Sequence, residues 1–239
     1  MSTSLLYHAF GVRGYRYVRT EYVKGGVGFR IEQPRESLRC PVCGSAEVIG
    51  RGRSARRFRT VSIGSKRVYL AMEVPRVECS VCGAVRQVKI GFAEPRVSYT
   101  RAFERYALEL SQFMTIKDVA EHLGISWDVI KDIQKAHLKR RYGRPKLKRL
   151  RHIAIDEIST AKGHVYLTIA LDLDSGAVVH VGRGKGGDAL REFWVALRRS
   201  GAKIEAVATD MSPAYIDAVT THLPRATLVF DRFHVIKLY

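Results

Sequence analysis

Four cysteines, arranged as two Cys-x-x-Cys pairs, place the strongest constraint on how this chain folds. Cys40 and Cys43 form one pair, Cys79 and Cys82 form the other, and a glycine follows each pair. Four thiolates at this spacing are typical of a tetrahedral zinc site, and the glycine permits the tight turn that aims backbone N–H groups at sulfur. Disulfides are the alternative, which two matched pairs in a chain without a secretory signal disfavour. The pattern therefore predicts structural Zn²⁺, but it does not identify what the zinc domain binds.

The 35 residues between the two cysteine pairs contain a basic stretch and then Val68, Tyr69 and Leu70. We expect a strand hairpin with a basic loop there, within a zinc-ribbon-like N-terminal region that covers residues 1–94. The arginines of the basic stretch are Arg51, Arg53, Arg56, Arg57 and Arg59. Residues 1–30 alternate aromatic, glycine and basic residues, which indicates strands whose partners the sequence does not identify.

The charge of the chain is concentrated in its first 150 residues. These hold 30 Lys and Arg against 13 Asp and Glu, whereas residues 151–239 hold 11 against 10. A cationic part joined to a nearly neutral part suits a DNA-binding region attached to a region that carries chemistry. The alternative is a generally basic soluble protein, because basic charge alone is common.

Residues 101–140 have the pattern of helices joined by a tight turn. Thr115 is placed as an N-cap before an apolar stripe, Gly124 ends that helix, and Ser126 caps the next one. Ile130 and Ile133 are expected to face inward. A small residue, a glycine turn and a capped helix are typical of a helix-turn-helix, and an ordinary helical hairpin is the alternative. The surrounding positive charge favours a helix-turn-helix DNA-binding domain over residues 95–145.

A basic segment, residues 139–151, follows the predicted helices and holds eight cations. Gly143 and Pro145 stop the helix there. The segment is either a solvated tether or a phosphate contact. The residues that we expect to contact DNA are Ser126, Lys131, Gln134, Lys135, Lys139, Arg140 and Arg141.

From residue 151 onward the pattern changes to strands. We expect strands at residues 151–158, 164–171, 177–181, 204–209 and 226–230, with helices at residues 188–200 and 212–223. This order is that of a ribonuclease-H-like sheet, in which three antiparallel strands are extended by two parallel strands reached through helical crossovers. Residues 146–239 are thus expected to form an incomplete ribonuclease-H-like α/β core of a multidomain α+β chain.

Two aspartates end strands that this topology makes neighbours. Asp156 ends the first strand and Asp210 ends the fourth, so both are expected at the carboxyl edge of the sheet. Neighbouring carboxylates suit one or two hard cations, Mg²⁺ or Mn²⁺, which would assist phosphodiester cleavage. For Asp210 the alternative is a cap on the following helix. Glu157 adjoins Asp156 and is expected on the other side of its strand.

The motifs together resemble those of bacterial insertion-sequence transposases of the ISL (L-three) type. The resemblance rests on the cysteine pairs, the helix-turn-helix, Ile155-Asp156-Glu157, Gly163-His164-x-Tyr166, Thr209-Asp210-Met211-Ser212 and residues 229–235. It implies DNA cleavage and strand transfer by an Asp-Asp-Glu triad with Mg²⁺. By motif, Asp156 and Asp210 are the first two acids. Asp231 and His234 match an Asp/Cys-x-x-His element, with a possible accessory role.

In that family the third acid is a glutamate on a later helix, and the sequence ends at Tyr239 where this helix would begin. We therefore expect a C-terminally truncated transposase that binds zinc and DNA but is deficient in strand transfer. Its expected partner is double-stranded DNA at terminal inverted repeats, with a homo-oligomer in the active assembly. A non-catalytic zinc and helix-turn-helix repressor of the element is the alternative. Without a membrane span or signal peptide, we expect a cytoplasmic protein, associated with the nucleoid when bound to DNA.

Overall fold

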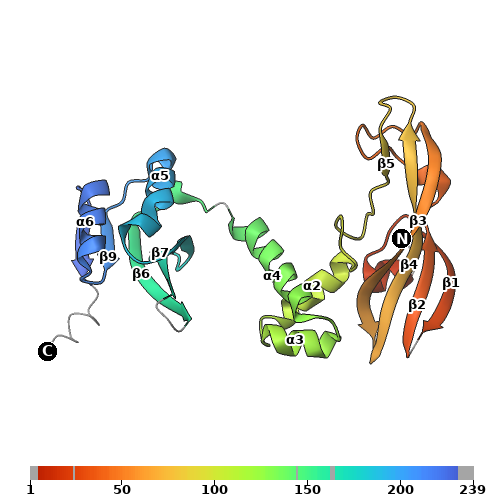
Figure 1. The fold of residues 1–239 in the computed structure, drawn as a ribbon, viewed down its shortest axis with the longest axis horizontal. Coiled ribbons are helices and arrows are strands. Elements are labelled where there is room, and N and C mark those ends of the chain that lie inside the picture. The colour runs from red at the N-terminus through yellow and green to blue at the C-terminus, as the bar shows by residue number, and fades with distance from the viewer. Residues whose placement is uncertain (1–4, 24, 144, 162–164, 231–239) are drawn as a thin grey trace. The chain divides into compact units, whose positions relative to one another are not determined.

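The computed structural model describes residues 5–23, 25–143, 145–161 and 165–230 (Figure 1). It divides the chain into two compact units, Met1–Leu138 and Lys139–Tyr239, which we describe separately. No helix among the described residues is long and apolar enough to cross a membrane.

The first unit begins with a short helix and a sheet of mixed direction. After helix α1 (Leu5–Phe10) come strands β1 (Arg16–Val23), β2 (Gly26–Glu32), β3 (Val48–Ile63), β4 (Lys66–Cys79) and β5 (Val85–Gln87), with a 3-10 turn, η1 (Arg35–Ser37), before β3. The strand order is β1-β2-β4-β3, and β5 pairs with the end of β4. Strands β2 and β4 are parallel, and the other pairs are antiparallel. The expected hairpin is therefore present as β3 and β4.

One detail of the expected hairpin is wrong. Its five arginines lie along β3 itself, and the turn that connects β3 to β4 consists of Gly64 and Ser65. The chain can place so many cations on one strand because β3 is an edge strand, with β4 as its only long partner. Arg51, Arg53 and Arg57 are exposed and keep their guanidinium groups in water, whereas Arg59 is buried.

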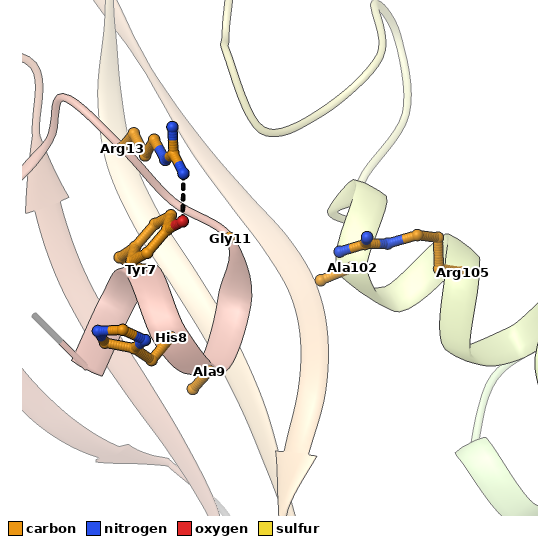
Figure 2. A pocket seen from close by; sticks show the side chains of 7 residues that line it. All are labelled: Tyr7, His8, Ala9, Gly11, Arg13, Ala102 and Arg105. Carbon is orange, nitrogen blue, oxygen red and sulfur yellow. Dashed lines mark hydrogen bonds between the residues drawn. The ribbon is translucent and has the colours of Figure 1, made fainter. Parts of the chain in front are cut away.

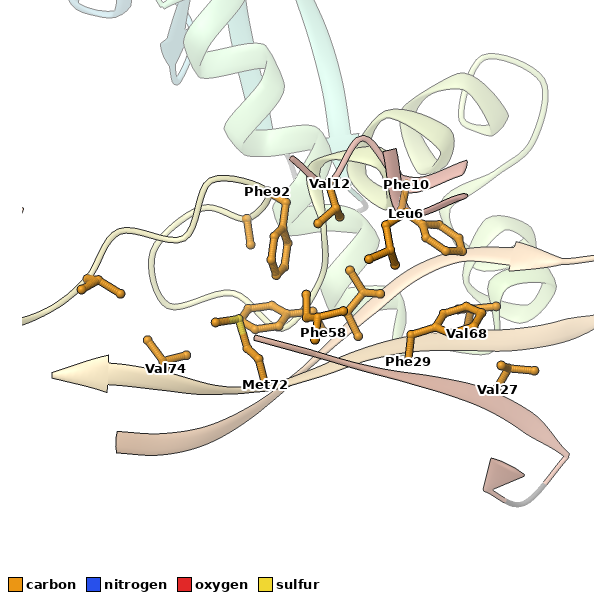
Figure 3. Close-up of a cluster of buried hydrophobic side chains, with 14 of the residues drawn as sticks. Leu6, Phe10, Val12, Val27, Phe29, Phe58, Val68, Met72, Val74 and Phe92 are labelled. Atoms are coloured by element: carbon orange, nitrogen blue, oxygen red, sulfur yellow. The ribbon is translucent and has the colours of Figure 1, made fainter. Parts of the chain in front are cut away.

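A single apolar cluster holds this sheet, helix α1 and the segment after β5 together (Figure 3). One face of the sheet contributes Phe29, Phe58 and Met72, and Phe10 of α1 and Phe92 pack against them. Phe58 and Phe92 meet edge-on with ring centroids 5.2 Å apart. Residues 1–94 thus contain a core of their own, which is independent of the cysteine-bearing turns.

Three helices follow: α2 (Arg101–Leu110), α3 (Ile116–Leu123) and α4 (Trp127–Tyr142). The expected caps are present, since Thr115 forms a capping box with Asp118 and Gly124 ends α3 in the left-handed region at φ 62°. Ile130 and Ile133 of α4 are fully buried against α2 and α3, as expected. The helices therefore form the compact three-helix arrangement that a helix-turn-helix requires.

Contacts from the β3–β4 hairpin fix these helices to the sheet. The segment before α2 runs alongside β3, where Arg59 N donates to Ser98 O at 2.7 Å and Thr100 N donates to Arg59 O at 2.9 Å. The guanidinium of Arg59 reaches the carbonyl of Leu123 at the end of α3, with an Nη2–O distance of 3.5 Å. Arg67 of β4 packs against the turn at Gly124. The zinc-bearing hairpin and the helical domain are thus joined at the turn of the helix-turn-helix.

Replacing Gly124 by alanine tests this join. The added Cβ would lie 2.1 Å from Nη2 of Arg67, and the backbone would remain at φ 62°. The flexible guanidinium can move away, so we expect a loss of stability of about 1–2 kcal/mol, from left-handed strain plus the lost contact. Gly64→Ala is the matched control, because Gly64 has φ 57° with no atom within 4 Å of the new Cβ. Equal shifts of the urea midpoint in the two variants would show that Arg67 contributes nothing at this turn.

The second unit contains a five-stranded sheet covered by helices. Its elements are a 3-10 turn, η2 (Leu147–Arg149), strands β6 (His152–Ala161), β7 (Val165–Asp172) and β8 (Val178–Arg183), a 3-10 turn, η3 (Gly187–Leu190), helix α5 (Arg191–Ser200), strand β9 (Ala206–Thr209), helix α6 (Pro213–His222) and strand β10 (Thr227–Phe230). The strand order is β10-β9-β6-β7-β8. Strands β6, β7 and β8 are antiparallel, whereas β9 and β10 extend the sheet in parallel. The expected element order and topology are confirmed.

Alternating side chains of the parallel strands pack against α5 and α6. Ile153 and Ile155 of β6 and Val207 of β9 belong to one cluster with Phe193 of α5 and Tyr215 of α6. Because strand side chains alternate between faces, the residue after Ile155 lies on the opposite side of the sheet from this cluster. That residue is Asp156, which is exposed.

Candidate functional site

The four cysteines converge to form a compact cluster. Their Sγ atoms all lie within 4.8 Å of one another. The Sγ atoms of Cys40 and Cys82 are 3.6 Å apart, and those of Cys43 and Cys79 are 3.5 Å apart. Four thiolates around zinc at Zn–S distances of about 2.3 Å would be about 3.8 Å apart. The cluster therefore fits a tetrahedral Zn²⁺, and none of the four cysteines forms a disulfide.

Both cysteine pairs adopt the same turn. Gly44 N donates to Cys40 O and Gly83 N donates to Cys79 O, each at 3.0 Å, and both glycines have positive φ. Backbone N–H groups of Cys43 and Val42 point at Cys40 Sγ and lower the pKa of this thiol to about 6. Such donors favour the thiolate, the form that binds a metal.

The second candidate site is the exposed face of α4. Ser126 Oγ accepts from Asp128 N at 3.3 Å, which confirms the expected cap. Lys131 extends over the ring of Trp127, with Nζ 4.3 Å from the centroid, and pairs with Asp128 at 3.1 Å. The remaining predicted DNA-contacting residues of α4 are Gln134, which is partly buried, and the exposed Lys135, Lys139, Arg140 and Arg141.

Trp127 is a residue of this face that the sequence reasoning missed. It is the first residue of α4 and is 54% exposed. In a helix-turn-helix, the first residues of the second helix are those that approach base edges. A large aromatic residue directly after an N-cap was the available signal in the sequence.

The third candidate site is the carboxyl edge of β6 and β9. These strands pair in parallel, and the last matched residues are Ile155 and Thr209. Asp156 and Asp210 each follow directly, so they occupy equivalent positions on strands that lie about 4.8 Å apart. Strand β10 pairs with β9 in the same way, with Phe230 opposite Thr209. Asp231 and His234, the predicted accessory residues, lie outside the described residues.

Each of the two aspartates uses one oxygen in a local hydrogen bond. Asp156 Oδ1 accepts from Glu157 N at 2.7 Å, and Asp210 Oδ1 accepts from Ser212 N at 3.0 Å. The second bond is a turn before α6, so the alternative that Asp210 supports this helix is partly realised. Within the described part of the chain, Oδ2 of neither aspartate is hydrogen-bonded. Glu157 is partly buried beside Lys185, with a carboxylate–Nζ distance of 3.8 Å, as expected for the other side of the strand.

The two carboxylates supply the hard oxygen donors that Mg²⁺ and Mn²⁺ prefer. Among the described residues they form only a pair, whereas the four cysteines form a complete ligand set. A cation at this edge would therefore take its other ligands from water, from a phosphate group or from residues outside the described ranges. The donor set fits a hydrated divalent cation that is shared with a substrate.

Three family models match consecutive parts of the chain. Residues 36–82 match a zinc finger of the transposases of IS204, IS1001, IS1096 and IS1165, and residues 88–138 match the helix-turn-helix domain of transposase family ISL3. Residues 153–239 match an ISL3 transposase model of the Asp-Asp-Glu class. The three matches cover the cysteine cluster, the α2–α4 helices and the strands that carry the aspartates.

Two curated relatives align with most of the chain. The transposase of insertion sequence element IS1001 from Bordetella parapertussis is 28% identical over 236 residues, which are 96% of this chain and 57% of the relative. The transposase of IS1557 from Mycobacterium tuberculosis is 33% identical over 211 residues, 85% of this chain and 47% of the relative. The chain thus spans about half the length of these relatives.

Solved structures are more distant. A Mos1 mariner paired end complex with Mn is 15% identical, with a TM-score of 0.23, over 59% of this chain and 61% of that one. A simian T-cell lymphotropic virus intasome has a TM-score of 0.27 at 17% identity, over 52% of this chain and 50% of that one.

Proposed function

Because this chain belongs to the ISL3 family of insertion-sequence transposases, we propose that it binds the terminal inverted repeats of its element and holds a divalent cation at Asp156 and Asp210. The activity that we propose for the whole transposase, of which this chain spans about half the length of its relatives, is phosphoryl transfer on DNA in an assembly with more than one copy. The single observation that carries the metal proposal is the parallel register of β6 and β9, which brings the two aspartates to equivalent strand ends.

The proposed DNA contacts lie on α4. Helix α4 carries Lys131 and Lys135, and three consecutive cations follow near its end, Lys139, Arg140 and Arg141. Cations near the carboxyl end of a helix also interact favourably with its dipole, so they can be gathered there at little cost to the fold. We propose that Ser126, Trp127 and Lys131 approach base edges, whereas the cations from Lys135 onward neutralise phosphates.

The proposed role of the two aspartates is to hold a divalent cation and to orient it. Mg²⁺ or Mn²⁺ at this edge would activate the attacking oxygen and stabilise the leaving oxygen of a phosphodiester. The hydrogen bonds from Glu157 N and Ser212 N fix Oδ1 of each aspartate, and Oδ2 remains available. Ligands that are held before binding lose less conformational entropy when the cation arrives.

Calorimetric titration of the zinc-loaded chain with Mn²⁺ and with Mg²⁺ tests this proposal. Asp156→Asn and Asp210→Asn should each weaken cation binding at least tenfold, about 1.4 kcal/mol, because each removes one of two charged ligands. Asp217→Asn is the matched control, since Asp217 is an exposed acid of α6 in the same unit.

If the two strand-end variants bind Mn²⁺ as tightly as Asp217→Asn does, the metal proposal is wrong. The non-catalytic zinc and helix-turn-helix protein would then be the better description. That alternative shares the cysteine cluster and α4 with the transposase proposal, so binding of DNA alone cannot separate the two.

A further inference from the structure

A surface hollow of about 480 Å³ lies between α1 and α2, and none of its described lining residues belongs to α4 (Figure 2). Tyr7 and His8 of α1 line one side together with Arg13, and Arg105 of α2 lines the other. The rest of the lining is small: Ala9, Gly11 and Ala102. A hollow with small residues between its polar groups admits a ligand atom close to the backbone.

The end of helix α1 directs Arg13 to this hollow. Gly11 ends α1 with φ 67°, and Gly11 N and Val12 N donate to the carbonyls of Tyr7 and Leu6, which is the usual closure of a helix by glycine. The chain then turns back, so the guanidinium of Arg13 stacks over the Tyr7 ring, 4.2 Å from its centroid, and donates to Tyr7 Oη. Stacking and the hydrogen bond limit the rotamers of this long side chain.

Arg105 approaches from the opposite side. Ala102 and Arg105 are three residues apart on α2 and share a face, while Phe103 and Ala107 are buried on the other. Nη2 of Arg105 lies 4.0 Å from the position that a Cβ on Gly11 would occupy. Arg105 is exposed, and no carboxylate among the described residues pairs with it.

The chemistry of the hollow therefore selects an anion. Two guanidinium groups face it, Tyr7 and His8 add polar atoms, and none of its described lining residues is Asp or Glu. The guanidinium fork matches the oxygens of a phosphate group, and arginine is the side chain that most often binds phosphate in this way. The hollow is wide open to solvent, which suits a group on a large polyanion better than an enclosed small molecule.

We propose that this hollow binds a phosphodiester group of duplex DNA, and so extends the DNA-binding surface from the helix-turn-helix onto α1. This inference rests on the proposed DNA-binding function. Helix α2 packs against α3 and α4, the two helices of the helix-turn-helix, through Phe103 and Ala107. Arg105 is on that helix, and Arg13 joins it from a part of the chain that the family's helix-turn-helix model, residues 88–138, does not include.

The test is the salt dependence of binding to a mixed-sequence duplex of about 30 base pairs, measured by fluorescence anisotropy on the zinc-loaded full chain. Each lost phosphate contact should reduce the slope of log K against log salt by about 0.9. For the double variant Arg13→Gln/Arg105→Gln we expect a slope lower by about 1 to 2 and an affinity about tenfold weaker at low salt. The double variant Arg13→Lys/Arg105→Lys keeps both charges and should keep most of the slope.

The matched control is Arg86→Gln/Lys89→Gln, which removes two exposed cations elsewhere in the same unit. If both double glutamine variants change the slope equally, the effect is one of net charge and the inference is overturned. Calorimetric titration with inorganic phosphate at constant ionic strength is a second test of this hollow. Saturable binding that is lost in Arg13→Gln/Arg105→Gln would assign the hollow to free phosphate and overturn the duplex assignment.

Failure of the proposed DNA-binding function would give a different result from failure of this inference alone. If the unaltered chain binds no duplex, both the DNA-binding function and this inference are wrong. If it binds, and Lys131→Ala/Lys135→Ala weakens binding while Arg13→Gln/Arg105→Gln matches the control, only the inference about the hollow is wrong.

Discussion

Chelation of zinc is expected to lower the melting temperature of the Met1–Leu138 unit by about 10 °C, while the transition of the Lys139–Tyr239 unit stays in place. A metal present at a thousand times its dissociation constant stabilises the folded state by about 4 kcal/mol, and 1 kcal/mol shifts the melting temperature of a domain of this size by about 2–4 °C. Zinc-finger peptides bind the metal still more tightly, so the expected shift is a lower bound.

The loss should be local, because of where the cysteines lie in the sheet. Cys79 is the last residue of β4. In the first turn Cys40 N donates to Ser45 O, and in the second turn Cys79 N donates to Ala84 O. The apolar cluster around Phe29, Phe58 and Met72 does not include the cysteines. Without zinc, the Sγ atoms have only weak hydrogen bonds with one another and with nearby backbone N–H groups, so the turns should open while the rest of the sheet remains.

Scanning calorimetry with and without a strong chelator measures the shift, and amide hydrogen exchange locates it. Cys43→Ser should reproduce the effect of the chelator, and Ser80→Ala, an exposed non-ligand beside Cys79, should not. Unchanged exchange at Gly44 and Gly83 after complete removal of zinc would show that the turns are stable by themselves, and that the metal is not structural.

The features that the sequence predicted well are those that short-range rules determine. The cysteine spacing requires a shared ligand, Thr115 and Gly124 are the residues that begin and end a helix, and the alternation around Ile153 and Ile155 identifies a strand with one buried face. The strand order of the second unit followed because helical crossovers between parallel strands permit few topologies. The register of Asp156 and Asp210 is a consequence of that order.

The contacts that the sequence did not predict depend on segments that are distant in the chain. Strand β2 pairs in parallel with β4, some forty residues later, and nothing local to either strand specifies this partner. Arg13 and Arg105 meet across the same hollow for the same reason. Arg59 was predicted in a basic loop, whereas it lies on β3 and is buried where the helices pack against this strand.

The largest effect of a single substitution away from the zinc cluster is expected at Arg59. This side chain is 7% exposed and donates to Thr60 O at 2.6 Å and Val68 O at 3.1 Å, besides the carbonyl of Leu123. Its guanidinium also lies over the ring of Phe103, 5.3 Å from the centroid. Burial lowers the pKa of Arg59, and Nε has no hydrogen-bond partner within the described structure. Burial of this charged guanidinium therefore costs free energy, which its hydrogen bonds to the carbonyls offset.

Replacement of Arg59 by alanine should destabilise the first unit by about 2–4 kcal/mol, because it leaves a cavity and several carbonyls without their donor. Arg59→Met keeps most of the volume and removes the buried charge, so it should cost less. Arg59→Lys cannot reach several carbonyls at once and should resemble Arg59→Ala more closely than a conservative change would suggest. Urea denaturation of the three variants measures these differences.

Arg57→Ala is the matched control. Arg57 is on the same strand, is exposed, and stacks over Tyr69 at 4.5 Å without a buried hydrogen bond, so its loss should cost at most about 1 kcal/mol. Hydrogen exchange should show faster opening at the end of α3 in Arg59→Ala and not in Arg57→Ala, because only Arg59 holds Leu123. Equal stability of the two variants would mean that the hairpin and the helices are joined by the backbone bonds at Ser98 and Thr100 alone, and that the buried cation is tolerated rather than required.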